Sequence, residues 1–163
     1  MPVLRPSVSS LKKAVSLLKS EELVVFPTET VYGLGADATS DMAVMKIFRV
    51  KKRPLFNPLI VHCHSKLSAR KIGYFDETSE KLAKYFWPGP LTMVLPKLDS
   101  ANISALVTSG HKTVALRVPK NRTTRKLIKL LNRPIAGPSA NPSGKLSPTN
   151  AIHVNEKIGK KIN

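Results

Sequence analysis

Three segments of the chain concentrate residue types that bind polar ligands. Residues 27–35 (PTETVYGLG) follow the apolar run 23–26, and residues 138–144 (PSANPSG) follow the run 134–137. Residues 51–59 (KKRPLFNPL) hold three consecutive cations and two prolines. Ligands of open α/β sheets bind beyond the carboxyl ends of strands. These residue types at these places indicate a site for a polar, anionic ligand.

The hydroxyl groups of Thr28 and Thr30 can bind such a ligand, and Gly33 and Gly35 let the backbone approach it closely. The same pattern is typical of a glycine turn with threonine caps. The GxGxxG and Walker patterns for phosphate binding are absent. Ser139, Asn141 and Ser143 raise the same two alternatives, because loops carry function and because serine, asparagine, proline and glycine also make ordinary turns.

The cationic segment favours an anion more strongly. Three cations suit the carboxyl end of a helix on dipole grounds alone. That reason does not account for the stiff stretch after Lys51, in which prolines hold Arg53 ready for a phosphate or carboxylate. Asn57 adds hydrogen-bond donors and an acceptor. We therefore interpret Arg53 and Asn57 as ligand-binding residues.

Two further residues stand out within apolar runs. His62 and His64 flank Cys63, but a single His-x-His pair without nearby carboxylates is weak evidence for a metal, so we expect no metal and a polar ligand contact by His62. Arg117 lies in the apolar run 114–118, where burying an unpaired charge is costly. It either faces water on an edge strand or points into a polar cleft, and the apolar neighbours favour the cleft.

Several chemistries are disfavoured. The chain has no GxSxG nucleophile elbow, no paired cysteines and few carboxylates. Placement of substrates and neutralisation of charge by Lys, Arg and hydroxyl groups remain, as in phosphoryl or nucleotidyl transfer.

The elements that must position these residues alternate between helix and strand. Apolar spacing and caps predict helices from residue 9 or 10 to 20, from 41 to 53, and over 78–87, 123–131 and 151–158. Short apolar runs predict strands over 23–26, 59–63, 91–95, 113–118 and 134–137. This order indicates an α/β sheet with packed helices.

Length and composition set the frame. The chain has 163 residues, the size of one domain, and 42% hydrophobic residues, which is enough for a core. Its formal charge of +17, spread along the chain, favours nucleotides or nucleic acid but is also typical of a solvated lysine-rich surface. No apolar run approaches the roughly 18 residues that span a membrane. The lone Cys63 and the lack of a signal-peptide core favour the cytoplasm.

Taken in order, these segments resemble the YrdC family, the threonylcarbamoyl-AMP synthases. The matching pieces are residues 27–35, residues 51–54 with 57–59, residues 87–92 (WPGPLT), residues 114–119 (VALRVP) and residues 139–144. The resemblance implies a twisted, mixed α/β sheet with flanking helices around a basic concave cavity. It covers residues 8 to 150, and five pieces in order make it specific.

The resemblance also implies an activity. Members of the family condense L-threonine, bicarbonate and ATP, with Mg²⁺, into threonylcarbamoyl-AMP and pyrophosphate, and a partner transferase complex then modifies adenosine 37 of tRNA. By resemblance, the threonine contacts are Thr30, His62, Arg117 and Ser139. The nucleotide contacts are Lys51, Arg53, Asn57, Asn141 and Ser147.

One departure concerns the end of the chain. Family members usually continue with a Gly-x-x-Ser-Thr strand and an Arg-x-Gly segment, neither of which appears before residue 163. We therefore expect one YrdC-like domain over residues 1–163 that lacks the usual last strands. The alternatives to a synthase are a non-catalytic RNA-binding module of the same fold and a shortened, inactive paralogue.

Overall fold

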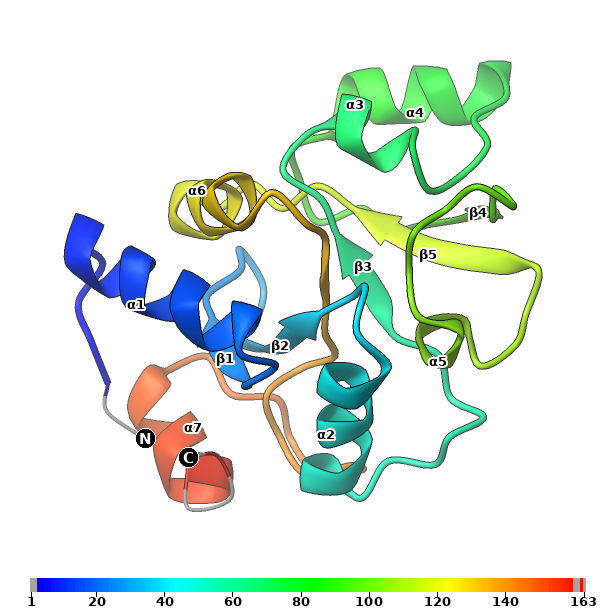
Figure 1. Ribbon diagram of the computed structural model, residues 1–163. Coiled ribbons are helices and arrows are strands. Elements are labelled where there is room, and N and C mark those ends of the chain that lie inside the picture. Colours follow the sequence, from blue (N-terminus) through cyan, green and yellow to red (C-terminus); the bar gives the residue numbers. More distant parts are fainter. Residues whose placement is uncertain (1–2, 160–161, 163) are drawn as a thin grey trace.

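The fold is a six-stranded sheet covered by helices on both faces (Figure 1). It comes from a computed structural model that describes residues 3–159 and 162. The helices are α1 (Val8–Lys19), α2 (Asp41–Lys51), α3 (Lys66–Ala69), α4 (Glu77–Phe86), α5 (Ala105–Thr108), α6 (Arg122–Leu131) and α7 (Ala151–Ile158). The strands are β1 (Val24–Phe26), β2 (Gly33–Asp37), β3 (Ile60–His62), β4 (Met93–Pro96), β5 (Thr113–Arg117) and β6 (Ile135–Ala136).

The strand order is β1-β2-β6-β3-β5-β4, and the sheet is mixed. β3 and β5 run parallel, and all other neighbours are antiparallel. The expected α/β class with a mixed sheet and flanking helices is therefore confirmed. Because β6 lies between β2 and β3, the polar loop that follows it starts near the middle of the sheet.

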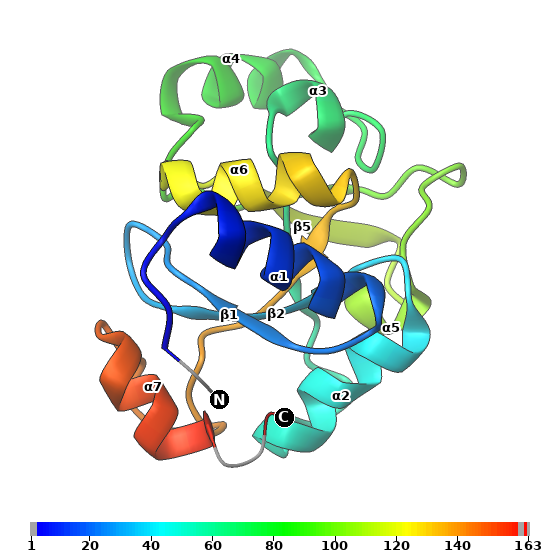
Figure 2. The same ribbon diagram turned by 60° about the vertical axis from the view of Figure 1, so that its left-hand side comes forward.

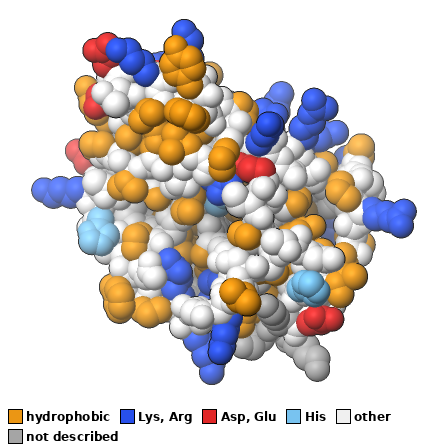
Figure 3. All heavy atoms as spheres, turned by 180° about the vertical axis from the view of Figure 1, so that it is seen from behind, with side chains coloured by type: hydrophobic (Ala, Val, Ile, Leu, Met, Phe, Trp, Pro, Cys, Tyr) orange, Lys and Arg blue, Asp and Glu red, His pale blue; other side chains and the backbone are white. Residues whose placement is uncertain are grey.

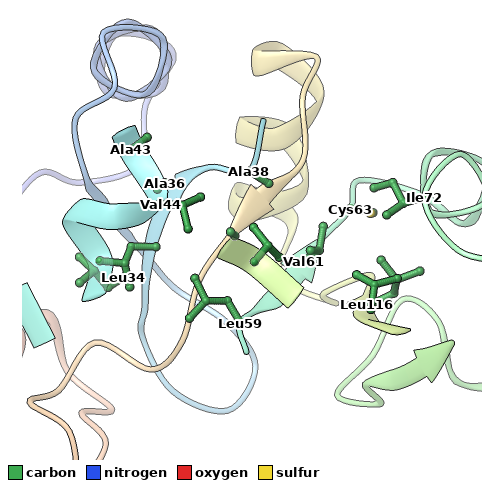
Figure 4. Packing of buried hydrophobic residues seen from close by; sticks show 14 of the residues in the cluster. Leu34, Ala36, Ala38, Ala43, Val44, Leu59, Val61, Cys63, Ile72 and Leu116 are labelled. Atoms are coloured by element: carbon green, nitrogen blue, oxygen red, sulfur yellow. The ribbon is translucent and has the colours of Figure 1, made fainter. Parts of the chain in front are cut away.

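Side chains on the two faces of the sheet belong to two separate cores. Val24 and Phe26 of β1 pack with α1 and α6, which lie side by side (Figure 2). Val25, between them, packs against the other core, as alternation along a strand requires. That larger core includes α2, which packs on β2, and Ala36 and Ala43 are both fully buried within it (Figure 4).

Short polar side chains fix where the helices begin. Ser7 caps α1 and accepts a hydrogen bond from the backbone N–H of Ser10, and Ser40 caps α2 in the same way through Ala43. α2 ends at Lys51, and Lys52 takes a left-handed conformation. The true caps lie earlier than Ser9 or Ser10 and Asp41, which the sequence pattern had favoured.

Cationic side chains are scattered over the surface and do not form one patch on the face shown in Figure 3. Among the described residues, no helix has both the length and the apolar character needed to cross a membrane.

Candidate functional site

Two predicted ligand contacts are direct neighbours on parallel strands. His62, the last residue of β3, pairs in register with Arg117, the last residue of β5. Both side chains are buried. Because the carboxyl ends of parallel strands meet at one edge, the imidazole and the guanidinium lie at the same place, where ligands of such sheets bind.

A pocket of about 300 Å³ opens there. Its wall comes from the β1–β2 loop, the segment that follows α2, the ends of β3 and β5, and the loop after β6. The lining residues are Thr28, Thr30, Val31, Tyr32, Gly33, Arg53, Pro58, Ile60, His62, Arg117, Gly137, Pro138 and Ser139. The structure therefore brings together all four predicted threonine contacts and one predicted nucleotide contact, Arg53.

Protein groups hold the guanidinium of Arg117 firmly. Its Nε donates to the carbonyl oxygen of Gly89 at 3.3 Å, and its Nη2 donates to Thr30 Oγ1 at 3.3 Å. Nη2 also lies 2.8 Å from Glu29 Oε1 in an ion pair. Gly89 belongs to the WPGP segment, which contains a cis peptide bond between Trp87 and Pro88. The Arg117 side chain points into the cleft, as the apolar surroundings predicted.

His62 is neutral at ordinary pH. Burial, and secondly the positive charge of Arg117, lower the pKa of His62 from 6.5 to about 4. Its ring packs edge-on against Phe26 with the ring centroids 5.1 Å apart. Nδ1 is buried without a hydrogen-bond partner among the described residues. A neutral imidazole beside a guanidinium can donate to or accept from a ligand without adding charge.

Thr30 is presented by a turn that Thr28 builds. The Thr28 hydroxyl donates to the carbonyl oxygen of Val31 at 2.6 Å and accepts from the backbone N–H groups of Thr30 and Val31 at 3.2 Å. Thr28 is thus a structural residue of the turn. The hydroxyl of Thr30 lies 3.0 Å from that of Thr28 and reaches Arg117.

Arg53 and Asn57, both predicted to contact the nucleotide, are bound to each other, and only Arg53 lines the pocket. Arg53 Nη2 donates to Asn57 Oδ1 at 2.7 Å and to the carbonyl oxygen of Pro58 at 2.9 Å, and its Nε donates to the carbonyl oxygen of Asn57 at 3.0 Å. Asn57 therefore orients the guanidinium, and Arg53 faces the pocket with a fixed direction.

Lys51 lies deeper than a surface phosphate ligand. It is buried, and its Nζ donates to the carbonyl oxygens of Ser139 and Asn141. The backbone N–H of Ser143 donates in return to the Lys51 carbonyl oxygen at 3.2 Å. In this structure Lys51 joins the end of α2 to the loop after β6, and it does not line the pocket.

The remaining predicted nucleotide contacts lie within that same loop. Asn141 is buried, and its Nδ2 donates to the carbonyl oxygens of Pro142 and Lys145. Ser147 Oγ donates to Asn141 Oδ1 at 3.3 Å. Asn141 and Ser147 thus stabilise the loop and lie outside the pocket lining, whereas Ser139 faces the pocket.

Packing within the protein, besides any approach of a ligand, explains why positions 33 and 35 are glycine. A Cβ atom on Gly33 would lie 2.6 Å from Cζ of Phe26, and one on Gly35 would lie 2.7 Å from both Phe26 and Ile135. The two glycines therefore make room for the Phe26 ring. They also belong to β2, a strand that glycine content had concealed in the sequence.

Glu29 is the site residue that sequence reasoning missed. It is one of ten acidic residues in a strongly basic chain, and it stands next to Thr30. That rarity within a candidate binding segment was the available signal.

Within the described part of the chain, no group of three or more His, Cys, Asp or Glu is placed to hold a metal ion.

A larger cavity, of about 370 Å³, lies between α1, α6 and β1. Its lining is mainly aliphatic and includes Leu11, Leu17 and Leu127. Because chemistry needs polar or titratable groups, the smaller pocket at Arg117 is the candidate functional site.

The fold and this pocket define an α/β domain with a pocket, lined in part by two arginines, at the ends of two parallel strands. Over residues 16–163 the chain matches the Sua5, YciO and YrdC family, which is described under the heading telomere recombination. The chain belongs to this family.

Several of its relatives are named threonylcarbamoyl-AMP synthase. The synthase of Pyrococcus abyssi is 50% identical over 93% of this chain and 44% of its own length. The synthase of Vibrio vulnificus is 36% identical over 95% of this chain and 84% of its own length. The structure of P. abyssi Sua5 complexed with L-threonine superposes with a TM-score of 0.92 and 47% identity, over 98% of this chain and 47% of that one. The chain thus spans about half of the P. abyssi protein.

Proposed function

We propose that this chain forms threonylcarbamoyl-AMP and pyrophosphate from L-threonine, bicarbonate and ATP. The observation that carries the proposal is the grouping of Thr30, His62, Arg117 and Ser139 around one pocket in a chain about half identical to P. abyssi Sua5, a protein whose structure has been solved with L-threonine. The names of the relatives support a synthase over an RNA-binding module of the same fold.

The pocket suits the first substrate. The guanidinium of Arg117, fixed by Gly89, Thr30 and Glu29, binds the carboxylate of threonine. His62 is neutral, so it can hydrogen-bond the substrate without offering the carboxylate a second positive charge beside Arg117. Burial of the inner wall limits access of water to the labile carbamate that forms when threonine reacts with bicarbonate.

The nucleotide lies towards Arg53. This guanidinium is oriented by Asn57 and neutralises the charge that develops on the transferring phosphate. Lys51 contributes indirectly. It binds the carbonyl oxygens of Ser139 and Asn141 and so fixes the backbone that separates the two substrates. Mg²⁺ enters bound to the phosphates of ATP, because the residues that line the pocket include no carboxylate and the described residues hold no group of three or more His, Cys, Asp or Glu placed for a metal.

The product serves modification of adenosine 37 in tRNA, and a threonylcarbamoyl-transferase complex is the proposed partner. We place the reaction in the cytoplasm, where the buried thiol of Cys63 remains reduced.

The experiment incubates the protein with ATP, Mg²⁺, bicarbonate and L-threonine and follows pyrophosphate, with mass spectrometry of the AMP-linked product. We expect pyrophosphate release that requires both threonine and bicarbonate. A folded protein that yields no AMP-linked product contradicts the proposal. Omission of each substrate in turn is the control.

A further inference from the structure

Glu29 pairs with the residue proposed to bind the substrate carboxylate. Its Oε1 lies 2.8 Å from Arg117 Nη2, and the side chains are 18% and 9% exposed respectively. Its other oxygen, Oε2, accepts a hydrogen bond from the backbone N–H of Lys120 at 3.2 Å. The carboxylate is therefore held by the β1–β2 loop, by β5 and by the segment that follows β5.

The carboxylate of Glu29 remains charged at neutral pH. Burial raises its pKa, but the hydrogen bond and charge of Arg117 and the backbone N–H groups outweigh burial, and the pKa lies below 4.5. At the same place His62 is neutral, because its pKa is lowered to about 4. Arg117, which lines the pocket, thus carries a positive charge, and the Glu29 carboxylate paired with it carries a negative charge directly beside the lining.

The guanidinium of Arg117 keeps one nitrogen for a ligand. Nε is bound to Gly89, and Nη2 is bound to Thr30 and Glu29. Nη1 donates no hydrogen bond to residues 3–159 and 162, and the Arg117 side chain lines the pocket. A ligand carboxylate on Nη1 comes next to the Glu29 carboxylate, which repels it unless the ligand brings a positive charge of its own.

An α-amino acid brings that charge. Its ammonium group is attached to the carbon next to its carboxylate. The carboxylate can therefore meet Arg117 while the ammonium group meets the neighbouring Glu29. A carboxylic acid without the amino group gains from Arg117 but loses to Glu29. The paired charges therefore distinguish zwitterions from plain anions, which a lone arginine does not do.

We propose that Glu29 is a specificity-determining residue of this site, whose carboxylate accepts the α-ammonium group of the substrate while Arg117 binds the α-carboxylate. The inference rests on the proposed function, because it takes threonine as the ligand of the pocket. It adds a residue that selects the amino acid by its ammonium group.

The test compares two ligands by calorimetry near neutral pH: L-threonine and 2,3-dihydroxybutyrate of matching configuration, which carries a hydroxyl in place of the amino group. We expect the unaltered protein to bind threonine at least about tenfold more tightly, the value of one charge-assisted hydrogen bond. In Glu29→Gln, threonine binding weakens by about 10- to 100-fold, whereas dihydroxybutyrate binding is unchanged or tighter.

Glu77→Gln is the matched control, because Glu77 is an exposed glutamate paired with Lys81 on α4. It leaves both affinities unchanged. The ratio of the two affinities within one protein does not depend on its stability, and the comparison in the unaltered protein stands even where Glu29→Gln does not fold.

Three results overturn the inference. Equal binding of both ligands by the unaltered protein removes the role of the ammonium group. Equal weakening of both in Glu29→Gln shows that Glu29 acts only through Arg117. No binding of threonine at all contradicts the proposed function itself, and the inference with it.

Discussion

The buried ammonium of Lys51 gives a quantitative prediction about stability. Burial, and secondly the charge of Arg53, lower the pKa of Lys51 from 10.5 to about 8. Between these two pH values the unfolded chain keeps a proton that the folded chain has released. Because the unfolded state then binds more protons, the free energy of unfolding rises with pH across this window.

The magnitude follows from the difference between the two pKa values. At roughly 1.4 kcal/mol for each pKa unit, the fall from 10.5 to about 8 corresponds to roughly 3 kcal/mol. We therefore expect the original protein to gain up to about 3 kcal/mol over Lys51→Met between about pH 8 and pH 10.5. Stability near neutral pH alone is not diagnostic. Near neutral pH, Lys51→Met has two opposite effects on stability. It loses the hydrogen bonds to Ser139 and Asn141, which lowers stability, and it avoids the cost of burying a charge, which raises stability.

The assay is urea unfolding followed by circular dichroism at about pH 7, 8.5 and 10. The difference in unfolding free energy between the original protein and Lys51→Met cancels the titration of all other groups. Lys52→Met is the control, because Lys52 is the exposed neighbour at the cap of α2. A difference that stays flat from pH 7 to pH 10 refutes the reasoning from burial.

Three further changes test the framework and the pocket. Gly33→Ala places a methyl group against Phe26 and should lower the free energy of unfolding by about 1–3 kcal/mol, with partial recovery when Phe26→Leu is added; unchanged urea midpoints would contradict the packing argument. Thr124→Val removes the hydroxyl that donates to the carbonyl oxygen of Pro27 and should lower the free energy of unfolding by about 1–2 kcal/mol. Thr123 is half-buried, and Thr123→Val should change the free energy of unfolding by less than about 0.5 kcal/mol. Arg53→Ala should reduce threonine-dependent pyrophosphate release at least about tenfold, with the exposed Arg49→Ala as control; full turnover would show that Arg53 does not face the phosphates.

Much of the fold was readable because its signals are local. The helix predicted over residues 151–158 has those bounds, and each of the short apolar runs overlaps a strand. β2 was missed because its sequence, GLGAD, has two glycines and no β-branched residue. The two glycines are needed because the Phe26 ring of β1 packs against them, which the local sequence does not reveal. The short helices α3 and α5 span a single turn each, too little for a periodic pattern to register.

The candidate site was readable to a similar degree. The five predicted contacts that line the pocket are Thr30, Arg53, His62, Arg117 and Ser139. They could be predicted because each lies in a motif at the end of a strand or in a loop that follows a strand or helix. The deeper positions of Lys51 and Asn141 were not accessible, since they follow from how the loop after β6 folds back on α2. The role of Glu29 depends on its distance to a residue far along the chain. Such partners are set by tertiary structure alone.

The two loops around the pocket are joined by backbone groups. The N–H of Tyr32 donates to the carbonyl oxygen of Pro148 at 2.9 Å, and the N–H of Ala140 donates to that of Tyr32 at 2.7 Å. These bonds do not involve the side chains of Thr30 and Ser139. The position of the two loops is therefore set by the main chain, whereas the direction of the Arg117 guanidinium depends in part on the Thr30 hydroxyl. A change at Ser139 is thus the milder way to alter the lining of the pocket, because a change at Thr30 also removes a contact of Arg117.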